Sequence, residues 1–124
     1  MEKAEDKVLS FCKTEVKKYY INIEMEGKPF KVRTYECGSK ANKTLVFVTG
    51  YLASALRHSC IFDELAKNYR VITFDHGCFG MNTRLESTNS ADSNQDAEAW
   101  MADQFERVIG KLDLPPKFLL AAHC

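Results

Sequence analysis

The chain lacks several features that would assign a function directly. It has no excess of either charge, since 17 Lys and Arg balance 17 Asp and Glu over 124 residues. A nucleic-acid-binding protein is expected to carry a basic excess on one face, so this balance argues against such a partner. No run approaches the roughly 18 apolar residues of a transmembrane helix. The first ten residues are charged throughout and lack the apolar core of a secretory signal. We therefore expect no nucleic-acid partner, no transmembrane segment and no secretory signal.

The cysteines also lack the spacing of a metal site. Five are present and no CxxC pair occurs among them: Cys12, Cys37, Cys60, Cys78 and Cys124. Zinc sites and redox dithiols usually contain such a pair, so we expect neither. The pattern favours free, buried thiols in a cytoplasmic or other reducing compartment for the first four cysteines. A GxGxxG phosphate loop is also missing, so no dinucleotide site is expected. Nothing else in the sequence implies a metal or an organic cofactor.

What is present is an ordinary globular composition, with 45% hydrophobic and 27% charged residues. Apolar residues at steps of three and four predict a helix over residues 3–18, which we treat as an N-terminal amphipathic helix spanning residues 1–19. Its other face mixes lysines with acidic residues, which favours a packing helix over a membrane anchor. Alternating residues from Tyr20 to Glu26 and from Phe30 to Cys37, around a turn at Gly27-Lys28, predict a β-hairpin.

The rest of the chain alternates buried strands with helices. Continuous apolar and β-branched runs predict strands over residues 44–49, 70–75 and 117–122. A helix is predicted over residues 96–112, and another over residues 56–69 from an apolar stripe of Leu56, Cys60, Ile61, Leu65 and Tyr69. This order predicts an α/β fold in which a hairpin precedes a βαβαβ unit with a parallel sheet. In such sheets function gathers in the loops at the carboxyl ends of strands, which are residues 50–54, residues 75–82 and the residues after Ala122.

Three short sequences at the predicted strand ends carry a family resemblance. They are Val48-Thr49-Gly50-Tyr51, Phe74-Asp75-His76-Gly77-Cys78-Phe79-Gly80 and Leu120-Ala121-Ala122-His123-Cys124. Together and in this order they resemble the His-Gly, Phe-Asp with Gly-x-Gly, and Gly-His-Ser-x-Gly elements of the α/β-hydrolase fold family. The look is closest to the branch with lysophospholipase, acyltransferase and lipase-coactivator members. The resemblance implies that residues 20–124 form the N-terminal half of an α/β-hydrolase domain.

The resemblance also implies roles for individual residues. Cys124 stands at the position of the nucleophilic serine, and the backbone N–H of Tyr51 or Leu52 would be one donor of the oxyanion hole. The turns of the same loops would be supported by Gly50, Asp75, Gly77 and Gly80. A cysteine can act as a nucleophile when a nearby base forms its thiolate. For Cys124 in a continued chain, a nucleophile and an inert replacement remain equal alternatives.

Three departures from the family pattern weaken an enzymatic interpretation. Thr49 replaces the histidine of His-Gly, Cys124 replaces the serine, and the family's acid and catalytic histidine would lie beyond residue 124. His76 and Asp75 are better interpreted as loop residues than as catalysts, because short Asp side chains tie turns together by hydrogen bonds to the backbone. We therefore expect the 124-residue chain alone to be inactive as a hydrolase.

Two functions remain open at this stage. The first is the N-terminal part of a carboxylic-ester hydrolase, for which a lipid ester is one candidate substrate. The second is a non-catalytic structural or accessory subunit of a larger assembly. In both, the strand over residues 117–122 would have one unpaired edge, and such apolar edges aggregate or find partners. We therefore expect the missing C-terminal half or another polypeptide to complete the sheet.

Overall fold

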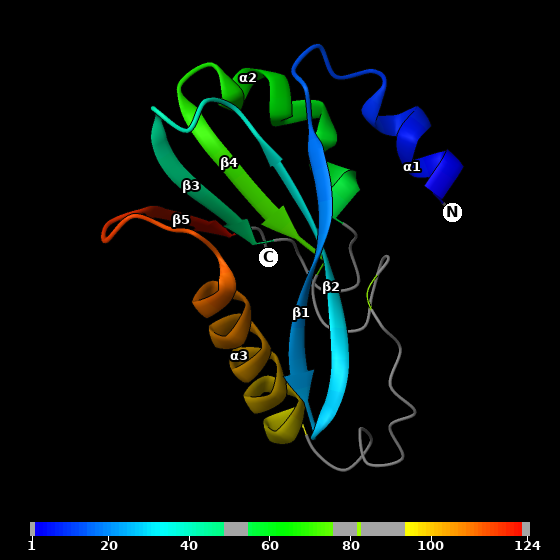
Figure 1. The fold of residues 1–124 in the computed structure, drawn as a ribbon, viewed down its shortest axis with the longest axis vertical. Coiled ribbons are helices and arrows are strands. Elements are labelled where there is room, and N and C mark those ends of the chain that lie inside the picture. Colours follow the sequence, from blue (N-terminus) through cyan, green and yellow to red (C-terminus); the bar gives the residue numbers. More distant parts are fainter. Residues whose placement is uncertain (1, 49–54, 76–81, 83–93, 123–124) are drawn as a thin grey trace.

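One five-stranded mixed sheet organises the chain (Figure 1). The computed structural model describes residues 2–48, 55–75, 82 and 94–122. In chain order the elements are α1 (Glu2–Leu9), β1 (Lys17–Met25), β2 (Lys28–Cys37), β3 (Lys43–Val48), η1 (Ala55–Ile61), α2 (Phe62–Ala66), β4 (Tyr69–Phe74), α3 (Asn94–Lys111) and β5 (Leu119–Ala122). The strand order across the sheet is β1-β2-β4-β3-β5.

The predicted hairpin and the parallel strands that follow it are confirmed. β1 and β2 pair antiparallel, but the turn lies one residue earlier than the predicted Gly27-Lys28, because Met25 pairs with Lys28 and leaves Glu26 at φ 52° and Gly27 at φ 71° between the strands. Two successive residues with positive φ give a two-residue turn whose twist matches that of the strands. β2 pairs antiparallel with β4, whereas β3 pairs in parallel with both β4 and β5. After the hairpin, the chain therefore has the parallel strands of an α/β fold.

Two apolar clusters cover opposite faces of the sheet. Phe30, Val32 and Phe74 lie in one cluster with Val108 of α3. Cys37 and Val71 lie in the other, with Phe62 and Ala66 of α2. Because side chains alternate between the faces of a strand, these positions on β2 and β4 point in opposite directions. Helix α3 therefore packs on one face, and η1 with α2 packs on the other. None of the helices in the described ranges is both long and apolar enough to cross a membrane.

The predicted helix over residues 3–18 is too long. Helix α1 ends at Leu9, and β1 already begins at Lys17, where the chain pairs with β2. Between them, the carboxylate of Asp63 accepts hydrogen bonds from the backbone N–H groups of Lys13 and Thr14, both at 2.8 Å. Phe11, which belongs to the predicted apolar stripe, is 78% exposed. Strand pairing and the contact with Asp63 therefore override the helical spacing of this segment.

The predicted helix over residues 56–69 is split into two helices, and the residues that it buries differ from those predicted. Its first part, η1, is a 3₁₀ helix, and only Phe62–Ala66 is α-helical. A 3₁₀ helix has three residues per turn, so the buried face moves to different positions. Phe62 and Ala66 are buried, whereas Cys60 and Ile61 from the predicted stripe are exposed. Tyr69, the last residue of that stripe, belongs to β4.

The last strand is shorter and far more exposed than its apolar sequence predicts. β5 pairs with β3 alone and forms one margin of the described sheet. Its residues Leu119 and Leu120 are 47% and 56% exposed. Successive residues of a strand point to opposite faces, so neither face of β5 is covered in the part of the chain that the structure describes. The apolar run thus marks a strand that requires neighbours.

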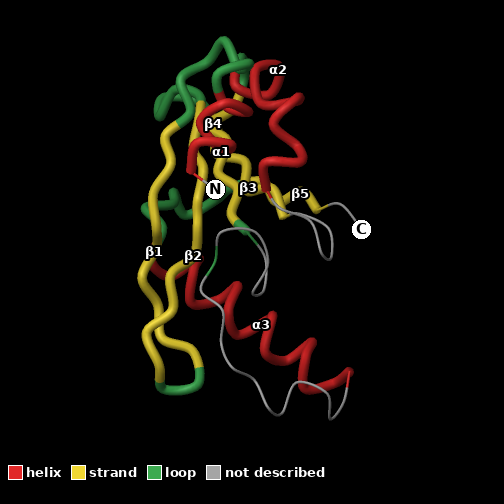
Figure 2. Tube along the Cα trace, turned by 90° about the vertical axis from the view of Figure 1, so that its right-hand side faces the viewer, coloured by secondary structure: helices red, strands yellow, loops and turns green. Residues whose placement is uncertain are grey.

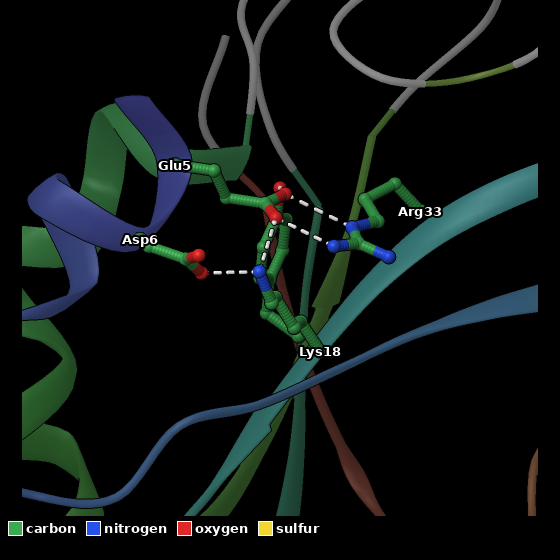
Figure 3. A network of polar contacts seen from close by, with 5 residues as sticks. Glu5, Asp6, Lys18 and Arg33 are labelled. Atoms are coloured by element: carbon green, nitrogen blue, oxygen red, sulfur yellow. Dashed lines mark hydrogen bonds and ion pairs between the residues drawn. The ribbon is translucent and has the colours of Figure 1, made fainter. Parts of the chain in front are cut away.

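Helix α1 is attached to the sheet by a buried carboxylate (Figure 3). Glu5 is 1% exposed, and its two oxygens accept hydrogen bonds from Arg33 at 2.9 and 2.5 Å and from the Tyr35 hydroxyl at 2.5 Å. Lys18 lies 3.1 Å from Glu5 and also contacts Asp6. Burial alone would raise the pKa of Glu5, but these donors together lower it to about 2. The network holds α1 on β2 and β1.

Replacing Glu5 with Gln should therefore destabilise the chain, because the guanidinium of Arg33 would remain buried without its carboxylate. Breaking a buried ion pair from one side costs about 3–5 kcal/mol, and we expect a loss near the lower end. Urea denaturation at neutral pH measures the change in the free energy of unfolding. The matched control is Asp6→Asn, whose carboxylate is 62% exposed, and its effect should be much smaller.

The Glu5→Gln variant also tests how this ion pair makes the stability of the chain depend on pH. The pKa of Glu5 is about 2 in the folded chain against an ordinary value of 4.5, so the folded state favours the ionised form. Its contribution is complete above pH 4.5 and is lost as the pH falls towards 2. The wild-type chain should lose stability more steeply than Glu5→Gln in that window. Parallel pH curves for the two proteins would contradict the assignment.

Candidate functional site

The carboxyl ends of β3, β4 and β5 meet at one edge of the sheet. Val48, the last residue of β3, pairs in register with Phe74 of β4 and with Ala122 of β5. Figure 1 shows the three strands running to this common edge. The three loops that are predicted to carry chemistry therefore begin at neighbouring positions. Parallel sheets place their functional loops at such an edge.

Most of the predicted site residues lie outside the described residues. These are Gly50, Tyr51, Leu52, Gly77, Gly80 and Cys124. Their roles as oxyanion donors, turn residues and nucleophile position therefore stay predictions. What the structure describes are the residues that flank these segments, such as Val48, Ala55 and Ala122. Asp75 is the predicted site residue that it describes.

Asp75 links the end of β4 to the beginning of η1. Its side chain is fully buried, and Oδ1 accepts a hydrogen bond from the backbone N–H of Ala55 at 2.8 Å. Its own N–H donates to the carbonyl of Arg33 in β2 at 2.9 Å. Since Val48 pairs with Phe74, both ends of the segment over residues 49–54 are fixed to the end of β4. The carboxylate thus accepts a backbone hydrogen bond, as the loop-support interpretation expects.

Asn82 extends the pairing of β2 and β4 beyond the end of β4. Its Oδ1 accepts from the N–H of Arg33 at 2.7 Å, and its Nδ2 donates to the carbonyl of Asp75 at 2.8 Å. The register of the two strands sets Arg33 opposite Asp75, where two direct backbone bonds would normally form. One of them is direct, and the amide of Asn82 bridges the other. Asp75 and Asn82, which flank residues 76–81, are therefore held at the same point of the sheet.

Sequence reasoning missed Asn82 and Arg33 as parts of this arrangement. The segment over residues 75–82 was selected as a loop, but nothing in the local pattern separates Asn82 from other asparagines of the chain. Its partner Arg33 lies 49 positions earlier. The only usable signal is the position of Asn82 at the end of a glycine-containing loop that follows a buried strand.

A cavity of about 740 Å³ lies at the other edge of the sheet. It is lined by residues near the amino ends of β3, β4 and β5, including Lys43, Arg70 and Lys117. Arg70 already donates to Glu36 at 2.9 Å and to the carbonyl of Asp113 at 2.8 Å. Because chemistry in parallel sheets gathers at carboxyl ends, this cavity is not part of the candidate site. Within the described ranges, no three His, Cys, Asp or Glu side chains gather as metal ligands would.

Replacing Asn82 with Ala should destabilise the chain, because the N–H of Arg33 and the carbonyl of Asp75 would lose a buried partner. Leaving a buried polar group unsatisfied costs about 1–3 kcal/mol. Chemical denaturation measures this loss, and the exposed Asn68→Ala serves as the matched control. Equal stability of the two variants would show that the Asn82 bridge contributes nothing.

The sequence of the chain is similar to two plant proteins. It is 32% identical to a "Probable 1-acylglycerol-3-phosphate O-acyltransferase" of Oryza sativa subsp. japonica, over 97% of this chain and 32% of that protein. It is 31% identical to a "1-acylglycerol-3-phosphate O-acyltransferase" of Arabidopsis thaliana, over 97% of this chain and 31% of that protein. The chain therefore spans about a third of the length of the curated relatives it matches. No protein-family profile matches it.

Solved structures resemble the whole arrangement. A putative lipase from Acinetobacter baumannii superposes with a TM-score of 0.70 at 17% identity, over 98% of this chain and 37% of the lipase. Naproxen esterase from Bacillus subtilis gives a TM-score of 0.68 at 16% identity, over 98% of this chain and 39% of the esterase. The thioesterase domain from the curacin biosynthetic pathway gives a TM-score of 0.67 at 24% identity, over 86% of this chain and 35% of the thioesterase chain.

These superpositions cover most of this chain and therefore establish its fold. Each sequence identity is below 25%, so they establish the fold alone. Each neighbour is an α/β-hydrolase fold protein, and each extends well beyond the matched region. The hairpin and the parallel strands β3, β4 and β5, whose carboxyl ends share one edge, match the arrangement that the sequence predicts. The chain therefore has the α/β-hydrolase fold and corresponds to the N-terminal part of that domain.

Proposed function

We propose that this chain forms the N-terminal part of an α/β-hydrolase domain that acts on a carboxylic ester of a glycerolipid. The observation that carries the proposal is the similarity to two proteins named as 1-acylglycerol-3-phosphate O-acyltransferases, which runs over 97% of this chain. Acyl transfer and ester hydrolysis share an attack on an acyl carbonyl, so the same site architecture serves both.

In this proposal the loops at the carboxyl edge carry the chemistry. Cys124 attacks the ester carbonyl as its thiolate, and the backbone N–H of Tyr51 or Leu52 stabilises the oxyanion. The bond of Asp75 to Ala55 supports this assignment, because it fixes the residue that follows the segment over residues 49–54 at the carboxyl edge of the sheet. The turns are assigned to Gly50, Gly77 and Gly80.

The proposed reaction needs groups that this chain does not provide. A general base and its orienting acid would come from the C-terminal part of the domain or from another polypeptide. The open margin at β5 supports this, because Leu119 and Leu120 are exposed on a strand that pairs on one side only. Adding a strand and a helix there would bury both leucines. We infer that the completing segment pairs along β5.

The second candidate is a non-catalytic structural or accessory subunit of a larger assembly. Its support is that Asp75 and Asn82 both bond to backbone groups at the strand ends, which stabilises the fold whether or not catalysis occurs. The cysteine at position 124, in place of the family's serine, also favours it.

We assign the chain to the cytoplasm or another reducing compartment. The thiols of Cys12, Cys37 and Cys60 are free, and Cys37 is buried in the apolar cluster beside α2. Free cysteines in a small domain are typical of compartments in which thiols stay reduced.

A fusion tests the enzymatic proposal. This chain would be joined to the portion of the rice relative that follows the matched region, and hydrolysis of p-nitrophenyl butyrate would be measured. The chain alone should be inactive. The rate of the fusion should exceed the background rate measured with the chain alone by about 10²-fold or more, because the added segment supplies the base.

Two variants of the fusion give the control. Cys124→Ala should abolish turnover, whereas Cys60→Ser should leave it unchanged. Turnover that survives Cys124→Ala would remove Cys124 from the reaction. A fusion that unfolds cooperatively but turns over no ester would favour the accessory subunit.

A further inference from the structure

The segment that follows α1 is held against η1 and α2 by three polar contacts. Cys12 Sγ lies 3.6 Å from the carbonyl oxygen of Ser59 and donates to it. The Asp63 carboxylate accepts from the N–H groups of Lys13 and Thr14, as described above. Figures 1 and 2 show α1 on the same side of the sheet as α2. We propose that Cys12 and Cys60 form a reversible disulfide that locks this segment onto η1.

The contact with Ser59 limits how far apart the two thiols can be. The oxygen of Ser59 belongs to the peptide unit that ends at the Cα of Cys60, and standard geometry separates these atoms by about 2.8 Å. Cys12 Sγ therefore lies within about 6.4 Å of the Cα of Cys60, since the two distances add to that limit at most. Rotation of the exposed Cys60 side chain and a small shift of the segment can then reach disulfide geometry.

The surroundings of the thiols set the order of reaction. Cys60 is exposed, so it meets a reagent from solution first. Cys12 is half-buried, and burial together with the neighbouring Asp63 and Cys60 raises the pKa of its thiol. Cys37 also lies near Cys12, but burial raises the pKa of Cys37 to about 12 and only 4% of the residue is exposed. A buried thiol of that pKa is a poor nucleophile at neutral pH.

The oxidant is a low-molecular-weight disulfide of the glutathione type. The thiolate of Cys60 attacks one sulfur of that disulfide, which forms a mixed disulfide and releases one glutathione thiolate. Cys12 then loses its proton to water and attacks the Cys60 sulfur, which breaks the mixed disulfide and releases the second glutathione. The two cysteines are oxidised by two electrons, and the glutathione disulfide is reduced by the same two.

The bond would tie the N-terminal segment to the helix that follows the loop over residues 49–54. η1 begins at Ala55, which Asp75 holds at the carboxyl edge of the sheet. Oxidation would thus restrict the motion of both ends of η1. This inference depends on the described contacts alone and does not require the chain to be an enzyme.

Peptide mapping of the full chain tests the proposal without any variant. The cysteines fall on separate tryptic peptides, and those of Cys12, Cys37 and Cys60 span residues 8–13, 34–40 and 58–67. After equilibration with oxidised glutathione, the non-reduced digest should contain the 8–13 peptide joined to the 58–67 peptide. Dithiothreitol should release both. A mixed disulfide alone, or a link of Cys12 to any other cysteine, would overturn the proposal.

Two matched variants give the second readout. Cys60→Ser should abolish the link and the rise in the thermal unfolding midpoint that oxidation causes. Cys37→Ser should retain both, because Cys37 takes no part. A wild-type chain whose midpoint is the same in oxidised and reduced form would show that no locking bond forms in the folded state.

Discussion

Arg33 is the residue on which the arrangement depends, because its side chain and its backbone hold different parts of the chain. The guanidinium donates to Glu5 of α1 and lies over the ring of Tyr20, 4.5 Å from its centroid. The carbonyl of Arg33 accepts from Asp75, and its N–H donates to Asn82. One residue of β2 therefore joins the N-terminal helix to the edge of the sheet where the candidate site begins.

These contacts link α1, β2, the end of β4 and the start of η1 in sequence. Burying Glu5 or Arg33 alone would be strongly unfavourable, so each charge requires the other and α1 must stay docked. From Arg33 the contacts pass to Asp75, and from Asp75 to Ala55 at the start of η1. Further along, in α2, Asp63 holds the segment that follows α1. We therefore expect that loosening the contact of Glu5 with Arg33 also weakens the bond between Asp75 and Ala55 at the carboxyl edge of the sheet.

Local patterns could predict the strands because strand alternation and β-branched runs are written in adjacent residues, and the motifs at the strand ends pointed to the fold. The prediction of a helix over residues 3–18 was wrong in its length, because β1 begins at Lys17, although the apolar residues there keep a helical spacing. The contacts of Glu5 and Asn82 were invisible because their partner lies 28 and 49 positions away. The family resemblance predicted the unpaired edge of the strand over residues 117–122, and the position of β5 at the margin of the described sheet confirms it. The apolar run by itself could not show how exposed Leu119 and Leu120 are, since it indicates that a strand can be buried but not that a neighbour covers it.

Native-state hydrogen exchange of Glu5→Gln tests whether α1 supports the carboxyl edge of the sheet through Arg33. The amide of Val46, fully buried in β3, is the internal reference. We expect the substitution to accelerate exchange at the amides of Arg33 and Ala55 more than at Val46, because local opening at their hydrogen bonds becomes easier. Acceleration by the same factor at all three amides would contradict it, since global destabilisation alone would then explain the effect.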